Sequence, residues 1–264
     1  MIHAMAEYQR VCEKAVRAAG ALLVDHIGHV AIREKAPSDL VTEADLASQA
    51  LVTKTILASF PDHLVLGEED SPLEARPTAE YRWIVDPLDG TTNYVHQYPF
   101  FCVSLALEQH GEILVGAIFD PLRKECFTAA KGHGAWLNGR ELRVSRVEDL
   151  AQAMLGVGLP YNLQRNSPDL LVFIETAPLC QSVRRTGSAA LNLAYLAAGR
   201  LDGFWSFSTK IWDVAAGVLM IREAGGVVTD PSGGNFNLEH AQFLAAATRP
   251  LHDSLAAIVR RAVP

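Results

Sequence analysis

The sequence is poor in cysteine, and its four cysteines form no recognisable pattern. Cys12, Cys102, Cys126 and Cys180 lie far apart, mostly within apolar runs, where a thiol usually acts as a small hydrophobic side chain. The sequence also lacks a His-Glu-x-x-His motif. We therefore expect neither a disulfide framework nor a zinc site.

Long apolar runs are missing too. No uninterrupted run approaches the roughly 20 residues that span a bilayer, and residues 1–10 lack the basic-then-apolar order of a signal peptide. We therefore expect a cytoplasmic protein that has no membrane partner.

Positive charge is in the minority, with 23 Lys and Arg residues against 30 Asp and Glu residues and a net charge of -7. Such a chain repels polyphosphates unless bound cations or a basic patch reverse the local field, so we expect no nucleic-acid partner. Hydrophobic residues make up 49% of the 264 positions. A chain of this size and composition can bury a large core, which excludes disorder as its main state.

Hydrophobic periodicity divides the chain into two halves, residues 1–147 and 148–264. The first half mixes elements in an α+β order, and its Pro-containing segment Ser71–Ala79 is the best loop candidate. The second half alternates strands and helices, which is typical of α/β structure. In the first half we predict helices at 8–24 and 43–59 and strands at 30–32, 64–66, 81–85, 100–107, 112–119 and 125–129; in the second, strands at 154–157, 204–207 and 227–229 and helices at 169–177, 188–198 and 214–224.

One motif combines metal-ligating and phosphate-binding groups. The strand that ends at Val85 leads into Asp86 and Asp89, two carboxylates three positions apart, and Gly90 and Thr91 then open a possible helix. Carboxylates, with the carbonyl oxygen of Leu88, are the hard oxygen ligands that Mg²⁺ prefers, while N–H groups at a helix start can hold phosphate oxygens. The alternative is an ordinary acidic turn, since Asp, Pro and Gly are also turn formers.

Three further segments concentrate acidic side chains. Adjacent acids in Gly67–Asp70 repel each other without a cation, although the segment could equally be a solvated loop. Asp213 follows Trp212 at the start of an apolar helix, where it is either a ligand or a plain N-cap. The fourth segment, Lys35–Asp45, leads from a basic residue into a helix entry rich in hydroxyl and acidic groups.

Together these segments resemble the inositol monophosphatase family. Its ordered signature is Asp-x-Val-Thr-x-x-Asp, Gly-Glu-Glu, Trp-x-x-Asp-Pro-x-Asp-Gly-Thr-x-Asn and Trp-Asp-x-Ala-Ala-Gly, and the four elements begin here at Asp39, Gly67, Trp83 and Trp212. The resemblance extends from about Glu7 to Ile258. It implies a layered αβαβα sandwich of mixed α+β and α/β type, a Mg²⁺-dependent phosphatase and a homodimer.

The resemblance also implies a ligand set for two Mg²⁺ ions. Glu68, Asp86 and the carbonyl oxygen of Leu88 would bind one ion, and Asp86, Asp89 and Asp213 would bind the second. A third, weaker ion would share Glu68. Most ligands therefore come from the first half of the chain, and the second half completes the site.

In the family pattern the attacking water is oriented by Glu68 and Thr91, and the hydroxyl of Thr91 is expected to bond with Asp45. Phosphate would rest on the amides of Gly90 and Thr91. Lys35 matches a basic residue of the family near the metal loop, or is a solvated lysine.

Members of the family differ in the residues that contact the alcohol part of the substrate. Gly187, Ser188 and Ala189 match the segment that contacts the alcohol. Ser206 stands seven positions before Asp213, where inositol phosphatases carry an acid that binds a ring hydroxyl, and a serine brings no charge. Lys210 could meet a second anionic group, or could be a surface lysine.

We therefore expect a Mg²⁺-dependent hydrolase of a small-molecule phosphate ester, with inositol 1-phosphate as the first candidate. Histidinol phosphate, fructose 1,6-bisphosphate and 3'-phosphoadenosine 5'-phosphate remain open, because they would share the metal site. A different class of function is a non-catalytic interaction protein on the same fold that engages a macromolecule through Arg184 and Arg185. The intact set of acids argues against that alternative.

Overall fold

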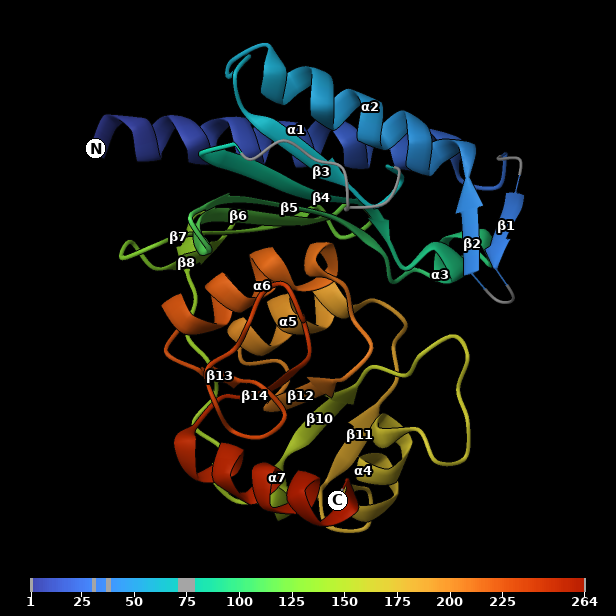
Figure 1. Cartoon of the computed structure of the whole chain (residues 1–264), viewed down its shortest axis with the longest axis vertical. Helices are drawn as coiled ribbons and strands as arrows, with labels where there is room; N and C mark the ends of the chain where they lie inside the picture. The colour runs from blue at the N-terminus through green and yellow to red at the C-terminus, as the bar shows by residue number, and fades with distance from the viewer. Residues whose placement is uncertain (1, 30–31, 37–38, 71–78, 264) are drawn as a thin grey trace.

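The structure is a computed structural model that describes residues 2–29, 32–36, 39–70 and 79–263. Five layers of helix and sheet are stacked along the long axis of the molecule (Figure 1). They form the αβαβα sandwich that the family resemblance predicts, so the predicted fold class is confirmed. The helical layers are α1 (Ile2–His26) with α2 (Glu43–Leu57), α5 (Ala189–Ala197) with α6 (Ile211–Glu223), and α4 (Pro168–Thr176) with α7 (Arg249–Ala262).

The first sheet has seven strands in the order β3-β4-β5-β6-β7-β8-β9, parallel only between β3 and β4. One face packs against α1 and α2 and the other against α6, so its central strands are apolar on both faces. A separate pair, β1 (Ile32–Ala36) and β2 (Asp39–Thr42), is antiparallel. The strands of the sheet are β3 (Leu64–Gly67), β4 (Tyr81–Asp89), β5 (Cys102–Gln109), β6 (Glu112–Asp120), β7 (Glu125–Ala130), β8 (Ala135–Leu137) and β9 (Arg140–Glu141).

The second sheet has five strands in the order β11-β10-β12-β14-β13. Strand β10 is parallel to both β11 and β12, while β14 is antiparallel to its neighbours. Helix α7 packs on β14 and against α4, which covers the outer face. The strands are β10 (Met154–Val157), β11 (Ser182–Arg184), β12 (Gly203–Ser206), β13 (Val227–Thr229) and β14 (Phe243–Ala246); the short helix η2 (Leu150–Gln152) precedes them.

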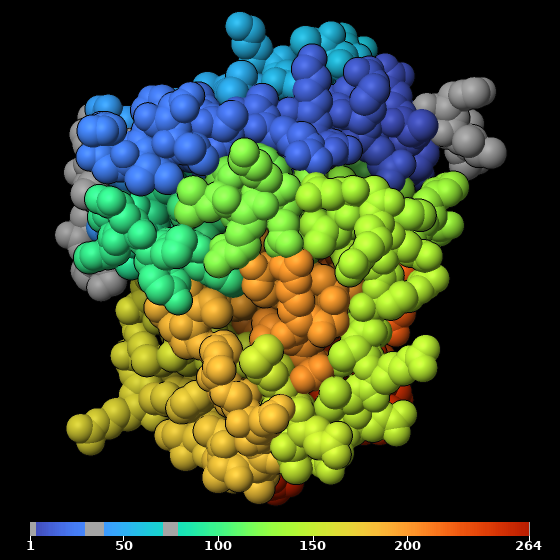
Figure 2. Space-filling view, turned by 180° about the vertical axis from the view of Figure 1, so that it is seen from behind, coloured from blue at the N-terminus to red at the C-terminus, as the bar shows by residue number. Residues whose placement is uncertain are grey.

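The last strand of the first sheet ends at Glu141, and the first strand of the second sheet begins at Met154. Helix α6 contacts strands of both sheets, so the division of the chain into halves 1–147 and 148–264 stays a prediction. Figure 2 shows the face opposite to Figure 1, where blue residues of the N-terminal helices lie above green strand residues and orange residues of the second half lie below them.

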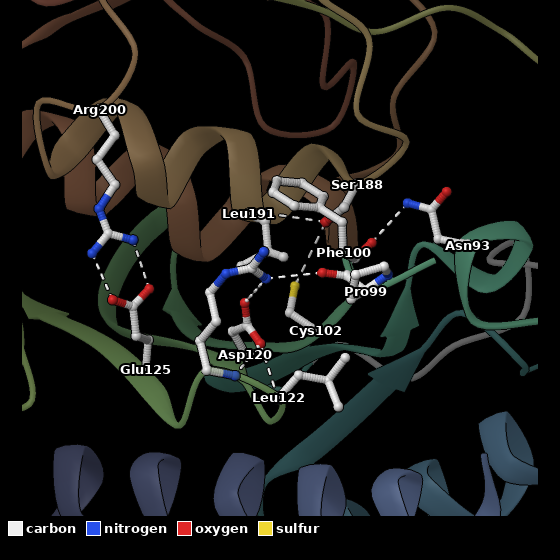
Figure 3. Close-up of polar contacts among 11 residues, drawn as sticks. Asn93, Pro99, Phe100, Cys102, Asp120, Leu122, Glu125, Ser188, Leu191 and Arg200 are labelled. Carbon is white, nitrogen blue, oxygen red and sulfur yellow. Dashed lines mark hydrogen bonds and ion pairs between the residues drawn. The ribbon is translucent and has the colours of Figure 1, made fainter. Parts of the chain in front are cut away.

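Small residues and an ion pair join the central helices to the first sheet. A Cβ atom on Gly116 of β6 would lie 2.9 Å from the Cα atom of Ala216 of α6, so only glycine permits this close approach. At the end of α5, Arg200 forms two hydrogen bonds of 2.6 Å with the carboxylate of Glu125 on β7 (Figure 3). These contacts fix the helical layer over the sheet.

Hydroxyl side chains cap two of the helices, and the start of α6 differs from the prediction. The Thr42 side chain caps α2 and the Ser188 side chain caps α5, as expected for hydroxyl residues at these positions. Helix α6 begins at Ile211 instead of Val214, because the Asp213 carboxylate accepts the Lys210 N–H at 2.8 Å from the third helical position. The interpretation of Asp213 as the N-cap is therefore wrong.

Other sequence predictions also need correction. Strand β4 continues through Asp89 instead of ending at Val85, with a register shift between Asp86 and Asp89. The predicted loop Ser71–Ala79, except Ala79, lies outside the described residues, as do residues 30 and 31 of the predicted strand.

No helix in the described part of the chain is long and apolar enough to cross a membrane.

A buried carboxylate in the second half makes stability depend on pH. Asp169 in the first turn of α4 is 2% exposed, and its Oδ1 atom accepts the Phe207 N–H at 2.8 Å. Burial raises the pKa of Asp169 to about 6. A folded-state pKa above the unfolded value means that its contribution to stability is intact at low pH and is lost as the pH rises toward and past 6.

We predict that Asp169→Asn is more stable than the wild type by up to about 2 kcal/mol at about pH 7.5, because asparagine keeps an acceptor for Phe207 and carries no charge. At about pH 4 the free energies of unfolding of the two proteins should be nearly equal. Urea unfolding at both pH values measures the difference, with the exposed Asp25→Asn as the control. A difference that does not change with pH would contradict the prediction.

Candidate active site

Strand β4 brings two carboxylates to one end of the first sheet. Asp86 is 1% exposed, and its Oδ1 atom accepts the Leu88 N–H at 3.0 Å. The other oxygen, Oδ2, accepts no hydrogen bond from any described residue. Asp89 follows after the register shift, which turns this end of β4 away from regular pairing with β5.

Asp89 joins the first sheet to helix α5. Its carboxylate accepts hydrogen bonds from the Ser188 hydroxyl, from Ala189 N–H at 3.2 Å and from Ala190 N–H at 2.7 Å. The Sγ atom of Cys102 also lies within 4 Å of Asp89. The same atom lies within 4 Å of the Ser188 hydroxyl (Figure 3). An anion at the N-terminus of a helix is favourable, so Asp89 holds the two halves of the chain together at this point.

Glu68 lies in a tight loop directly after β3. Its N–H donates to the Val85 carbonyl at 3.2 Å, which continues the pairing with β4. Gln49 of α2 supports the loop, donating to Asp70 at 2.9 Å and accepting from the Glu69 N–H at 3.1 Å. The sequence analysis did not identify this role of Gln49, which lies on a helix face with no motif.

Burial, and for Asp86 and Asp213 also the charge of neighbouring acids, raises the pKa values of the three aspartates of the site. Burial raises the pKa of Asp86 well above its ordinary value, and the charges of Glu68, Asp89 and Asp213 raise it further. Burial also raises the pKa of Asp213, with Asp89 and Glu68 adding to the effect. The pKa of Asp89 is raised by burial even though its hydrogen bonds act in the opposite direction. Four neighbouring acids therefore share a site where their negative charges are mutually unfavourable.

This donor set fits a hard divalent cation. Within the described chain, no three acidic, histidine or cysteine side chains already converge as a complete ligand group. The chemistry of the donors nevertheless suits Mg²⁺, because all are oxygen ligands and a cation would relieve the repulsion. Asp213, like Asp86, offers an oxygen, Oδ1, that accepts no hydrogen bond from the described residues.

Gly90 and Thr91 turn the chain from β4 into the short helix α3 (Thr91–Val95). Gly90 has φ 95°, and a Cβ atom there would lie 3.0 Å from the Phe100 carbonyl, so glycine is required. The Thr91 hydroxyl lies 3.3 Å from Asp45 Oδ1 and 3.1 Å from the Leu88 carbonyl. The expected contact with Asp45 is present, and the first N–H groups of α3 lack helical acceptors.

Asp45 is buried and has a structural function as well. Its Oδ2 atom accepts the Thr42 N–H at 2.8 Å and the Thr42 hydroxyl at 2.6 Å, which forms the capping box of α2. The start of α2 is thereby fixed beside Thr91. The Lys35 side chain lies outside the described residues.

A cavity of about 750 Å³ opens over the carboxylates. Every site residue predicted from the sequence lines it, except Asp45, which lies behind Thr91. These predicted lining residues are Glu68, Asp86, Leu88, Asp89, Gly90, Thr91, Gly187, Ser188, Ala189, Ser206, Lys210 and Asp213. Their chemical roles stay predictions.

The cavity also has walls that the sequence analysis missed. Residues 157–162 follow β10, and Arg185 follows β11. The end of the predicted strand Met154–Val157 could have indicated the first of these, because ligands of α/β sheets bind beyond the carboxyl ends of parallel strands. Strand β11 gave no such signal, since it has only three residues.

The whole chain matches known proteins. The model of the inositol monophosphatase family matches residues 4–263. The chain is 40% identical to an inositol-1-monophosphatase of Rhizobium meliloti over 96% of both chains, and 40% identical to the Nus factor SuhB of Pseudomonas aeruginosa over 89% of this chain and 90% of the relative. A solved structure of the extragenic suppressor protein suhB of Bartonella henselae is 37% identical, with a TM-score of 0.91 over 97% of this chain and 100% of that one. The chain belongs to the inositol monophosphatase family.

Proposed function

We propose that this protein is a Mg²⁺-dependent phosphomonoester hydrolase that acts on a small polyol or sugar phosphate. The observation that carries the proposal is the set of four carboxylates, Glu68, Asp86, Asp89 and Asp213, that line the floor of one cavity. Burial raises the pKa of the three aspartates, and the charges of neighbouring acids raise those of Asp86 and Asp213 further. A phosphate ester is also an anion, so this floor can accept it only together with cations. Membership in a family of Mg²⁺-dependent phosphatases supports the same conclusion.

Two or three Mg²⁺ ions are proposed at this floor. Glu68, Asp86 and the Leu88 carbonyl would hold one, and Asp86, Asp89 and Asp213 would hold another, with Glu68 shared by a weaker third. Bound Mg²⁺ supplies charge neutralisation at the phosphate and lowers the pKa of water toward neutrality. Asp86 and Asp213 each present an oxygen without a hydrogen bond for such contacts.

The remaining residues of the site position water and phosphate. Thr91 is held by Asp45 and by the Leu88 carbonyl, so its hydroxyl oxygen is fixed and can accept a hydrogen bond from a water molecule. Glu68 can accept a proton or orient the same water. The N–H groups of Gly90 and Thr91, at the start of α3, can donate to phosphate oxygens.

Inositol 1-phosphate is the first substrate to test, because a relative of similar length is named inositol-1-monophosphatase. The alcohol would lie against Gly187, Ser188 and Ala189. Ser206 faces the same cavity without a charge, so histidinol phosphate, fructose 1,6-bisphosphate and 3'-phosphoadenosine 5'-phosphate are alternatives on the same metal site.

A second candidate function is binding to a macromolecular partner, because several relatives are named Nus factor SuhB. Arg184 ends β11 and Arg185 follows it; both are exposed and could contact an acidic partner. Assays of phosphate release with and without a chelator separate the candidates. The proposal expects release from inositol 1-phosphate or one of the alternatives, its loss in chelator and its return with Mg²⁺. No release from any of these esters at saturating Mg²⁺ would favour the binding role.

We predict that Asp213→Asn lowers kcat/KM at least about 100-fold, because an amide is a poor replacement for an anionic ligand of Mg²⁺. The variant should also melt at a higher temperature than the wild type in chelator at about pH 7.5. The raised pKa of Asp213 means that its ionised form costs stability as the pH rises past that pKa, and asparagine removes this cost while keeping an acceptor for Lys210.

The stabilisation of Asp213→Asn by added Mg²⁺ should correspondingly be smaller than that of the wild type. Thermal melting with and without Mg²⁺ measures both effects, and Asp25→Asn on the exposed end of α1 serves as the control. A Mg²⁺-induced shift in the variant equal to that of the wild type would exclude Asp213 from the metal site.

We predict that Ca²⁺ does not support turnover and inhibits the Mg²⁺ enzyme. Mg²⁺ takes a compact octahedral shell at about 2.1 Å, whereas Ca²⁺ accepts longer, irregular shells that misplace an attacking water. Initial rates at fixed Mg²⁺ with increasing Ca²⁺ test this expectation. Full activity with Ca²⁺ as the sole cation would contradict it.

A further inference from the structure

The outer wall of the active-site cavity is built at the carboxyl ends of three adjacent parallel strands. Strands β11 and β12 flank β10, with Arg184 and Phe204 both aligned with Gly156. Arg185 therefore leaves the sheet beside residues 157–162, and Ser206 leaves it on the other side. Two strand spacings separate the two positions, which is about 10 Å.

Two cations on this wall have no acidic partner. Arg185 and Lys210 are exposed, line the cavity and, in the described part of the chain, form no ion pair within 4.0 Å. By contrast, Arg82, Arg123 and Arg200, which lie outside the cavity, each pair with a carboxylate.

A buried hydroxyl lies on the same wall. Ser206 is 1% exposed and lines the cavity, and among the described residues its Oγ atom has no hydrogen-bond partner. It packs against Gly158, where a Cβ atom would lie 2.4 Å from that oxygen. Glycine at 158 therefore leaves the space that the Ser206 hydroxyl occupies.

Acids line only the floor. Of the described residues that face the cavity, the acidic ones are the four proposed metal ligands, and the outer wall contributes cations, hydroxyls and the amide of Asn162. A volume of about 750 Å³ is also much larger than a single phosphate group needs. The cavity thus has an acidic end, where metal ions are proposed, and a basic end whose Arg185 and Lys210 form no ion pair among the described residues.

We propose that Arg185, Lys210 and Ser206 form a subsite for a second anionic group of the substrate, a phosphate or a carboxylate on the alcohol that is released. This inference rests on the proposed phosphatase function and narrows its substrate class to phosphate esters that carry two anionic groups. Arg185 and Lys210 would supply charge-assisted hydrogen bonds, and the Ser206 hydroxyl would donate a neutral one.

The test compares substrates that differ only in the second anion. Glycerol 2-phosphate and 2-phosphoglycerate differ by one carboxylate, and fructose 1-phosphate and fructose 1,6-bisphosphate differ by one phosphate. The wild type should prefer the doubly anionic member of at least one pair by about tenfold in kcat/KM, and the preferred pair identifies the anion. In Arg185→Gln/Lys210→Gln that preference should fall below about threefold.

Arg184→Gln is the matched control. Arg184 is an exposed neighbour of Arg185 that does not line the cavity, and its side chain bonds to Ser182. It should keep the wild-type preference. If the double variant loses kcat/KM equally on both members of each pair, the subsite proposal is wrong, because the two cations then bind the phosphate that is hydrolysed. No preference in the wild type would overturn it as well.

Failure of the subsite is distinguishable from failure of the proposed function. If no ester is hydrolysed with Mg²⁺, the phosphatase proposal fails. Calorimetric titration of 2-phosphoglycerate and glycerol 2-phosphate, and of the two fructose phosphates, in Ca²⁺ then still measures binding to the cavity. If the wild type binds the doubly anionic member of one pair more than about tenfold more tightly than the singly anionic member, and the double variant does not, the result supports the subsite. If this ratio of affinities is the same in the wild type and the double variant, the subsite is rejected.

Discussion

Repulsion between buried carboxylates is the constraint on which the site depends. Asp86 and Asp213 are forced into proximity with Glu68 and Asp89 by strands and helices from both halves of the chain. Desolvation and like charge both disfavour the ionised forms, so the fold stores an unfavourable interaction at this point. A divalent cation bound between these carboxylates, as proposed above, would make the same arrangement favourable.

Asp89 links this constraint to the architecture. Its carboxylate is both a member of the charge cluster and the acceptor for the first N–H groups of α5, and α5 belongs to the central layer that α6 shares between the two sheets. Thr91 makes a similar connection, because Asp45, which contacts its hydroxyl, also caps α2. The floor of the cavity is therefore held by α2, by the first sheet and by the central layer of α5 and α6.

The sequence predicted the layers, the acidic floor and two residues of the outer wall, Ser206 and Lys210, but not the wall that Arg185 and the segment at 157–162 form. Long apolar strands such as β5 and β6 and the capped start of α2 carry strong local signals, and the motifs around Asp86 and Asp213 identified the floor. Strand β11 has only three residues and forms by pairing with β10, so no local pattern marks it. The start of α6 was misplaced, because the Asp213 side chain reaches back to Lys210, a contact that periodicity does not reveal.

Calorimetric titration of Mg²⁺ into chelator-treated protein tests the central claim most directly. The account predicts saturable binding of more than one ion per chain, with affinity that weakens as the pH falls into the raised pKa range of the carboxylates. Those acids must lose their protons before they can ligate the ion. Absence of saturable binding, or an affinity that does not change between about pH 7.5 and about pH 5, would contradict the view that these four acids form one cation-dependent charge cluster.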